Sequence, residues 1–159
     1  MKLVKPSKAQ SEHVEYAGRW WESVSGGSRT AGRMLGWLMV CEPAHQSSAE
    51  MTDALQASAG SISTQSRMLE AIGVLERVTF PGDRQTYYQL PIHVWVDLMW
   101  AEQDRLKGLM RVAEKAEPAM PRERPDRVAD LGRIAQFFID EWPSLMERLT
   151  AYLEKETTA

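Results

Sequence analysis

Cysteine and histidine are scarce in this sequence. Its 159 residues include one cysteine, Cys41, and three histidines, His13, His45 and His93. One cysteine excludes a disulfide within the chain, and the histidines are too far apart in the sequence to indicate a metal site. We therefore expect no metal and no other cofactor. Cys41 follows an apolar helix and precedes Glu42, which favours a buried, inert thiol over a redox sensor.

Long apolar runs are absent as well. No stretch reaches the roughly 18 to 20 residues that a membrane span needs, and residues 1–6 lack the apolar core of a signal peptide. With 43% hydrophobic and 26% charged residues the composition is that of a globular protein, and the length is about that of one domain. We therefore expect a soluble, cytoplasmic protein with no membrane partner.

Sequence motifs of common enzymes are missing too. The sequence holds no glycine-rich loop that could cradle a phosphate, no cluster of metal ligands and no nucleophile elbow around a serine. We therefore expect that the protein is not an enzyme.

An excess of positive charge, which would favour nucleic-acid binding, is also lacking. The formal net charge is -3, whereas neutralisation of phosphates by Lys and Arg supplies most non-specific affinity for DNA. Residues 1–41 nevertheless carry six Lys or Arg against three Glu, and residues 91–159 carry ten against thirteen acidic residues. The charge is therefore compatible with a DNA-facing end and a remote acidic end.

What the sequence does contain is a helix followed by a hairpin, over residues 58–90. Ser58 can cap the helix, whose apolar positions Ile62, Leu69 and Ile72 define a buried side. Two predicted strands follow, at residues 75–80 and 85–90. The turn between them contains Pro81 and Gly82, which suit the central positions of a type II turn.

Three more helices are predicted before this segment. Residues 7–24 show helical spacing with one buried aromatic face, and residues 28–40 follow with Ser28 as the N-cap. A short helix through Leu55 opens with a capping box formed by Ser47 and Glu50. This helix and the one capped by Ser58 are joined by a tight turn, which is typical of a helix-turn-helix, and the hairpin after them is typical of a winged helix.

These elements predict which residues contact DNA. The first half of a recognition helix reaches base edges in the major groove, and an arginine at a wing tip can enter a minor groove. Two arginines at the start of the second helix could contact phosphates. The expected DNA-binding residues are therefore Ser58, Ser61, Ser63, Thr64, Gln65, Arg67, Asp83, Arg84, Arg29 and Arg33.

The C-terminal part is predicted to be helical and to form a dimer. A long helical pattern runs from residue 92 to about residue 117, and a second runs from about residue 126 to residue 156 with Pro143 inside it, where we expect a kink. Apolar residues in the second recur at alternating steps of four and three, which is the seam of a packed helix pair. The seam, and hence the expected dimer interface, consists of Leu131, Ala135, Phe138, Trp142, Leu145, Leu149 and Tyr152. A helical hairpin within one monomer is the alternative.

The sequence resembles the MarR superfamily of winged-helix regulators, and more closely its GbsR-type branch. The similarity runs from about Trp21 to Leu90, and is carried by residues 31–38, 58–63 and 69–73 and by Pro81-Gly82-Asp83-Arg84 with Tyr87-Tyr88. It implies a homodimeric bacterial transcription factor, in most cases a repressor, that binds a pseudo-palindromic operator. Each recognition helix would read one half-site, and each wing arginine would lie in a flanking minor groove.

The resemblance and the patterns together predict one architecture. The fold is mainly α with a small β-wing: an N-terminal helix over residues 1–27, a winged helix-turn-helix domain over residues 28–90 and dimerisation helices over residues 91–159. Double-stranded DNA, a second copy of the chain and a small-molecule effector are the expected partners. GbsR-type proteins are associated with choline or glycine betaine, but that ligand is not carried over to this chain, because the similarity beyond Pro91 is only architectural. An effector pocket would involve Trp20, Trp37 and Trp95, whereas tryptophans at helical spacing are more often core or interface residues. A winged-helix module that binds proteins instead of DNA is the alternative.

Overall fold

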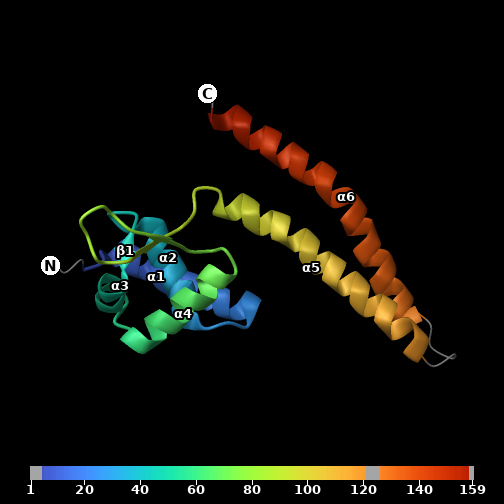
Figure 1. Ribbon diagram of the computed structural model, residues 1–159, viewed down its shortest axis with the longest axis horizontal. Coiled ribbons are helices and arrows are strands. Elements are labelled where there is room, and N and C mark those ends of the chain that lie inside the picture. Colours follow the sequence, from blue (N-terminus) through green and yellow to red (C-terminus); the bar gives the residue numbers. More distant parts are fainter. Residues whose placement is uncertain (1–4, 121–125, 158–159) are drawn as a thin grey trace. The chain divides into compact units, whose positions relative to one another are not determined.

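The computed structural model describes residues 5–120 and 126–157. The chain divides into two compact units, one over residues 1–94 and the other over residues 95–159. Figure 1 shows the helices of the first unit packed as one cluster, coloured from blue to green. Its described elements are α1 (Lys8–Ser25), α2 (Arg29–Val40), β1 (Gln46–Ser47), α3 (Ser48–Leu55), α4 (Ala59–Ala71), β2 (Glu76–Val78) and β3 (Tyr87–Gln89).

Helices α1 and α2 cross at very short range because small residues lie at the crossing. A Cβ atom on Gly32 would lie 2.5 Å from Trp21 Cβ and 2.7 Å from the Ala17 carbonyl oxygen. One on Gly36 would lie 2.6 Å from Ala17 Cβ. Real Cβ atoms do not approach other atoms so closely, so these positions admit only glycine at this spacing. The buried residues of α1 are accordingly Val14, Ala17 and Gly18.

The buried face predicted for α1 is therefore correct at Val14 and Ala17 but wrong for its aromatic residues and Val24. Trp20 is 47% exposed, Trp21 is half-buried and Val24 is exposed. The spacing of large apolar residues indicated the helix correctly, but the tight crossing with α2 buries the small residues next to them.

The helix-turn-helix follows the predicted boundaries closely. Ser47 and Glu50 form a reciprocal capping box at the start of α3, and the Ser58 hydroxyl accepts the Ser61 N–H at the start of α4. Gln56, in the left-handed region at φ 48°, makes the turn between the two helices. Met51 and Leu55 of α3 and Ile62 and Leu69 of α4 are buried with Met34, Leu35 and Trp37 of α2.

Ile72 does not belong to the buried side of α4, contrary to the sequence pattern. The helix ends at Ala71, Ile72 is its C-cap, and Gly73 has a φ of 75°. The chain then turns back, so that the N–H groups of Val74 and Leu75 both donate to the Leu69 carbonyl oxygen. Val74 and Leu75 enter the core in place of Ile72, which is 47% exposed.

The sheet has three strands in the order β1-β3-β2, all antiparallel. Arg77 pairs with Tyr88 across β2 and β3, and Gln46 pairs with Tyr88 across β1 and β3. Strand β1 was not predicted, because two residues are too short to show a strand period. The two wing strands are also shorter than predicted. One cause is that the Gln85 N–H donates to the Asp83 carboxylate at 2.8 Å and not to a neighbouring strand.

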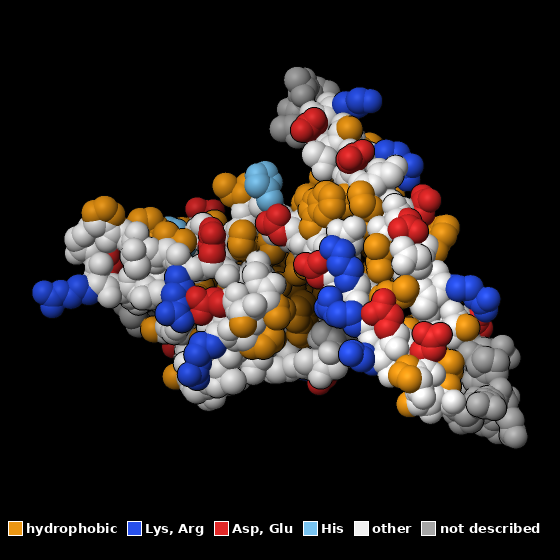
Figure 2. Space-filling view, turned by 45° about the vertical axis from the view of Figure 1, so that its right-hand side comes forward, with side chains coloured by type: hydrophobic (Ala, Val, Ile, Leu, Met, Phe, Trp, Pro, Cys, Tyr) orange, Lys and Arg blue, Asp and Glu red, His pale blue; other side chains and the backbone are white. Residues whose placement is uncertain are grey.

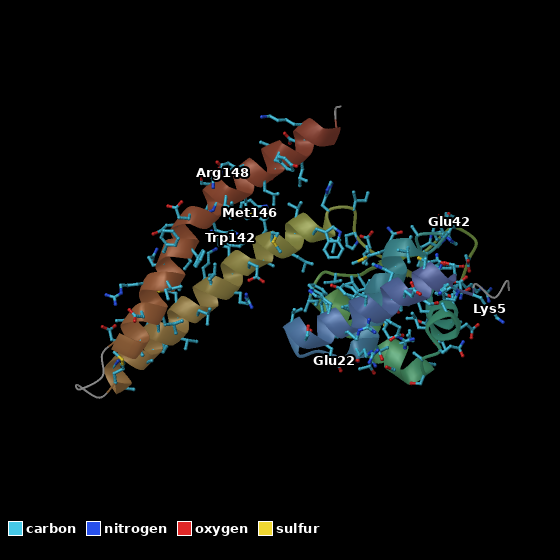
Figure 3. All side chains as sticks on the ribbon, turned by 180° about the vertical axis from the view of Figure 1, so that it is seen from behind. Lys5, Glu22, Glu42, Trp142, Met146 and Arg148 are labelled. Atoms are coloured by element: carbon cyan, nitrogen blue, oxygen red, sulfur yellow. The ribbon has the colours of Figure 1, made fainter. Side chains whose placement is uncertain are left out.

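The second unit is a helical hairpin. It consists of α5 (Val94–Ala116), which begins at the last residue of the first unit, a 3-10 turn η1 (Glu117–Ala119), and α6 (Asp126–Thr157). Trp142 of α6 donates its indole N–H to the Met99 carbonyl oxygen of α5 at 3.0 Å, and Met146 is buried. Figure 3 shows both side chains on the side of α6 that faces α5.

Helix α6 continues through Pro143, as the unbroken seam predicts. Its ribbon changes direction along its length (Figure 1), which is what the expected kink requires. No helix within the described residues is long and apolar enough to cross a membrane.

From the close crossing of α1 and α2 we predict the effect of two substitutions on stability. Gly32→Ala should lower the free energy of unfolding by about 1 to 3 kcal/mol, because the added methyl group has no space. Gly60→Ala is the matched control: no atom lies within 4 Å of its Cβ position, and alanine should stabilise the helix by up to about 1 kcal/mol. Urea unfolding of both variants measures the difference. An unchanged midpoint for Gly32→Ala would contradict the close crossing.

Candidate nucleic-acid interface

One edge of α4 is exposed and polar. Ser63, Thr64 and Arg67 are exposed, and Ser61 and Gln65 are half-buried beside them. The opposite side of α4 carries Ile62, Ser66 and Leu69, all fully buried. The predicted division of this helix into a core side and a free side is therefore correct for residues 61 to 69.

Ser66 is a buried residue that the sequence reading missed. Its hydroxyl is buried and has no hydrogen-bond partner among the described residues. The signal was present, because residues 62, 66 and 69 follow the steps of four and three that mark one side of a helix. A serine was not counted as a core residue, although it is small enough to fit under a neighbouring helix.

Two of the predicted contact residues also have local roles. The Ser58 hydroxyl caps α4, so it accepts a hydrogen bond from the helix itself at 3.2 Å. Arg67 Nε donates to the Ser63 carbonyl oxygen at 3.3 Å, one turn earlier on the same helix. Arg67 is exposed, and its remaining guanidinium N–H groups are donors that could bind an acceptor.

The wing tip is a tight turn in which Asp83 organises the backbone. The Asp83 N–H donates to the Phe80 carbonyl oxygen at 3.1 Å across Pro81 and Gly82, and Gly82 has the φ of 85° that a type II turn needs. The Asp83 carboxylate accepts the Gln85 N–H at 2.8 Å and the Tyr87 hydroxyl at 2.7 Å. These bonds fold the loop around Asp83 and leave its neighbour Arg84 exposed.

The same bonds shift two ionisable groups. The backbone N–H of Gln85 and then the hydroxyl of Tyr87 lower the pKa of Asp83. Asp83 in turn raises the pKa of Tyr87, since the carboxylate accepts the phenolic hydrogen. Because the pKa of Asp83 is lower in the folded wing than in the unfolded chain, its carboxylate stabilises the wing at pH values above the unfolded pKa. This contribution is lost as the pH falls through the folded pKa. The contribution of the Asp83 carboxylate to the wing turn is therefore present at neutral pH.

Two further contacts hold the wing to the rest of the first unit, and sequence reasoning missed both. Arg77 of β2 forms an ion pair with Glu70 of α4, with Nε 2.5 Å and Nη2 2.8 Å from the carboxylate oxygens. His45, just before β1, contacts the Phe80 ring in a tilted arrangement and the Tyr87 ring edge-on, with centroid distances of 4.6 Å and 5.1 Å. His45 lies far from Phe80 and Tyr87 in the sequence, and Glu70 and Arg77 lie on different elements, so no periodic pattern pointed to these contacts.

Arg29 and Arg33, the predicted phosphate contacts of α2, are both paired with Glu15 of α1. Arg29 Nη2 lies 2.7 Å from one carboxylate oxygen and Arg33 Nε 2.8 Å from the other. Arg33 Nη2 also donates to the Leu55 carbonyl oxygen at 2.7 Å. Partial burial opposes ionisation of Glu15, but the Arg29 hydrogen bond and the charge of Arg33 outweigh it and lower its pKa. The Arg29 side chain is 45% exposed and the Arg33 side chain 23%.

The three tryptophans expected at an effector site have different surroundings. Trp37 is fully buried, and its indole N–H donates to the Gln46 side chain at 3.3 Å. Trp20 and Trp95 are both 47% exposed, the first in one unit and the second in the other. An aromatic cage that includes Trp37 would need a route into the core of the first unit.

A separate cavity of about 280 Å³ lies within the second unit, at the end of the hairpin where α5 meets η1 and α6. None of the three tryptophans lines it. Its lining is mainly apolar, with two carboxylates: Met110, Ala113, Glu114, Glu117, Met120, Val128, Ala129 and Gly132.

The predicted seam of α6 divides into two groups. Ala135 is buried, and Trp142 is bonded to α5 within the same chain. Phe138, Leu145 and Tyr152 are each more than 40% exposed, as is Phe137 beside them. Figure 2 shows apolar side chains recurring between charged ones along this hairpin. Part of the seam therefore packs between α5 and α6 within the hairpin, and the other part is exposed on the hairpin surface.

Among the described residues, no group of three or more His, Cys, Asp or Glu could hold a metal ion. Cys41 is buried at the end of α2 and forms no disulfide. Burial, and then the charges of Glu42 and Glu50, raises the pKa of the Cys41 thiol to about 11.

Comparisons with known proteins agree with this geometry. No family model matches the sequence. The chain is 42% identical over 106 residues to the HTH-type transcriptional regulator MmpR5 of Mycobacterium tuberculosis (strain ATCC 25618 / H37Rv), a match that covers 67% of this chain and 62% of that protein. The matched part thus spans less than two thirds of MmpR5.

A crystal structure of a transcriptional regulator is 33% identical to the chain, with a TM-score of 0.79, and the match covers 90% of this chain and 99% of that one. The fold predicted from the sequence, mainly helical with a small β-wing, is thereby confirmed. The transcriptional regulator Tm0710 from Thermotoga maritima is more distant, at 17% identity and a TM-score of 0.42 over 91% of this chain and 93% of that one.

The surroundings of Cys41 predict slow reaction with thiol reagents. At pH 8 a thiol with a pKa of about 11 is ionised in roughly one molecule in a thousand, and only the thiolate reacts. Iodoacetamide should therefore label the folded protein at least about a hundredfold more slowly than the same protein in urea. Since the chain has one cysteine, the denatured sample is the control. Labelling at equal rates would show that Cys41 is accessible and reactive.

Proposed function

Because this chain belongs to a family of winged-helix transcriptional regulators, we propose that it binds double-stranded DNA as a homodimer and acts as a repressor. The operator is pseudo-palindromic, with α4 in the major groove of each half-site and the wing in the adjacent minor groove. One observation carries the proposal. The polar edge of α4 and the wing that exposes Arg84 belong to one compact unit and are joined by the ion pair between Glu70 and Arg77.

The edge of α4 suits direct recognition of bases. Ser63 and Thr64 are small and exposed, so they allow the helix to come close to the base pairs. Gln65 and Arg67 carry the amide and guanidinium groups that form paired hydrogen bonds with adenine and guanine. Ser58 and Ser61, at the first turn, would lie nearest the phosphates beside the groove.

The wing suits recognition of the minor groove. Its turn is shaped by Asp83, which bonds its own loop and is therefore a support for Arg84. An extended guanidinium responds to the negative potential of a narrow, A·T-rich minor groove without reading individual bases. Arg84 would accordingly contribute to affinity at many sequences.

Electrostatics limits which cations take part. Arg77 is paired with Glu70, and its pKa is raised by the hydrogen bond and the charge of that carboxylate. Among the described residues, Arg67 and Arg84 form no ion pair and are exposed, and Arg29 keeps nearly half of its side chain in solvent. Within residues 28–90, the cations available to DNA are therefore Arg67, Arg84 and part of Arg29.

A second copy of the chain is proposed to cover the surface of the α5–α6 hairpin. Large apolar side chains are exposed on both helices, and contiguous apolar surface of this kind often marks a protein interface. Two-fold symmetry would then set the half-sites about 10 bp apart, or one turn of DNA.

The three parts of the chain then have different roles: residues 28–90 contact DNA, and residues 1–27 and 91–159 supply packing and dimer contacts. The exposed apolar side chains of α5 and α6 that we propose to lie in the dimer interface include Met99, Trp100, Leu109, Val112, Ile134, Phe137, Phe138 and Leu145.

The closer affiliation is with the MarR superfamily and its GbsR-type branch, on the strength of the motifs described for residues 21–90. In that setting a small-molecule effector would alter the spacing of the two DNA-binding units. Trp20 and Trp95 remain the proposed effector contacts with access to solvent, and Trp37 would act from the core.

A protein-binding module is the second candidate, and one observation favours it. Three arginines of the first unit, Arg29, Arg33 and Arg77, are paired with carboxylates, which leaves few cations for phosphate. DNA binding by the purified protein decides between the two. Retention that is weak, independent of sequence and lost at physiological salt would favour the protein-binding module.

Salt dependence separates the two kinds of DNA contact. Arg84→Ala should weaken binding to many sequences and reduce the slope of log K against log salt by about 0.9, as expected for one lost phosphate contact. Thr64→Ala, Gln65→Ala and Arg67→Ala should instead change the sequence preference. Titration against genomic fragments at two salt concentrations measures both effects. A change of preference by Arg84→Ala with an unchanged slope would contradict this assignment.

The dimer proposal is tested by a charge placed in the exposed part of the seam. Phe138→Lys and Leu145→Lys should convert the dimer to a monomer, because a buried unpaired ammonium is costly. Ser144→Lys, on the same helix but outside the seam, is the control and should remain dimeric. Sedimentation equilibrium measures the mass. A wild-type monomer, or variants with the wild-type mass, would exclude an interface at this seam.

A further inference from the structure

Arg33 joins three helices through its side chain. Its stem runs over Gly18 of α1, where a Cβ atom would lie 2.7 Å from Arg33 Cγ. Its Nε lies 2.8 Å from the Glu15 carboxylate of α1, and its Nη2 donates to the carbonyl oxygen of Leu55, the last residue of α3. Because Glu15 and Gly18 are one turn apart, α1 offers Arg33 a carboxylate and a bare stretch of backbone on the same face.

The Leu55 carbonyl group lies at the end of α3, where a hydrogen bond from another element can stabilise the start of the turn. The last carbonyl groups of a helix lack donors from the following turn, and directly after Leu55 the chain enters the turn that sets the angle between α3 and α4. That turn includes Gln56 in the left-handed region. Its backbone hydrogen bonds measure 3.4 Å from Gln56 and 3.2 Å from Ala57, and the Gln56 side-chain amide donates to the Asp53 carbonyl oxygen at 2.6 Å. The charged bond from Arg33, at 2.7 Å, joins the end of α3 to α2.

We propose that Glu15 and Arg33 are positioning residues that fix the turn between α3 and α4 from α1, and that Arg33 supports DNA binding without touching a phosphate. This rests on the proposed function. Glu15 orients the guanidinium and neutralises it, and the guanidinium holds Leu55. Arg29 differs, because it shares Glu15 but donates to no carbonyl group of α3 and is about twice as exposed. The phosphate contact on α2 is therefore Arg29.

Substitution of Glu15 distinguishes a positioning role from a phosphate contact by the sign of its effect when it is made in the Arg29→Gln background, because Arg29 shares Glu15 and is itself the proposed phosphate contact. If Arg33 supports the turn, adding Glu15→Gln weakens operator binding by about tenfold, since a charge-assisted contact is lost. If Arg33 binds phosphate, adding Glu15→Gln strengthens binding and steepens the salt dependence, because it frees Arg33. Glutamine has the same size as glutamate, so the close packing of α1 and α2 is preserved.

Arg33→Lys gives an independent readout. Lysine keeps the charge and can bind a phosphate, but it lacks the planar fork that reaches Glu15 and Leu55 together. We expect about tenfold weaker binding with an unchanged salt slope. The double variant should be no weaker than Arg33→Lys alone, because Glu15 acts through Arg33. Arg29→Gln is the matched control and should reduce the salt slope by about 0.9.

Hydrogen exchange without DNA tests the positioning role separately from the proposed function. Backbone amides of residues 56–61 should exchange faster in Glu15→Gln and Arg33→Lys than in the wild type, and Arg29→Gln should leave them nearly unchanged. If the wild type binds no DNA, the proposed function fails, but hydrogen exchange still tests whether Glu15 and Arg33 hold the turn between α3 and α4. Unchanged exchange at these residues, or tighter operator binding when Glu15→Gln is added to Arg29→Gln, would overturn the proposal.

Discussion

The close crossing of α1 and α2 is the constraint on which the rest of the first unit depends. Glycine at positions 18, 32 and 36 lets the two backbones approach to within a distance that no other residue allows. The approach brings Glu15 of α1 within reach of Arg33, and it lets the Arg33 stem lie over Gly18. Through Arg33 the position of α1 is transmitted to the end of α3, and so to the helix proposed to read DNA.

A second set of contacts gives the wing its orientation. Arg77 ties β2 to α4 by an ion pair, and His45 ties the segment before β1 to Phe80 and Tyr87 by ring contacts. Within the wing, one carboxylate, Asp83, bonds both a backbone N–H and a phenol. The exposed Arg84 is thus carried by a loop whose neighbours are held on several sides, which limits the positions that its guanidinium can reach.

Local sequence signals predicted the helices well because those signals are themselves short-range. Ser47 with Glu50, and Ser58, cap the helices that they were expected to cap, and Pro81-Gly82 makes the expected turn. Errors arose where a reversal of the chain or a contact with another element decided the outcome. Ile72 fits the helical spacing of α4, yet the hydrogen bonds to Leu69 bring Val74 and Leu75 into the core instead. Strand β1 exists only because β3 lies beside it.

The sequence by itself determined the order of the helices, the caps that start them, the wing turn and the polar edge of α4, since each follows from spacing or from residues a few positions apart. The tertiary structure alone decided which charges are available. Arg29, Arg33, Arg77 and Arg84 look alike in the sequence, but only a folded chain brings Glu15 and Glu70 next to the first three. A charge acts according to its nearest partner in space, and that partner lies on another element.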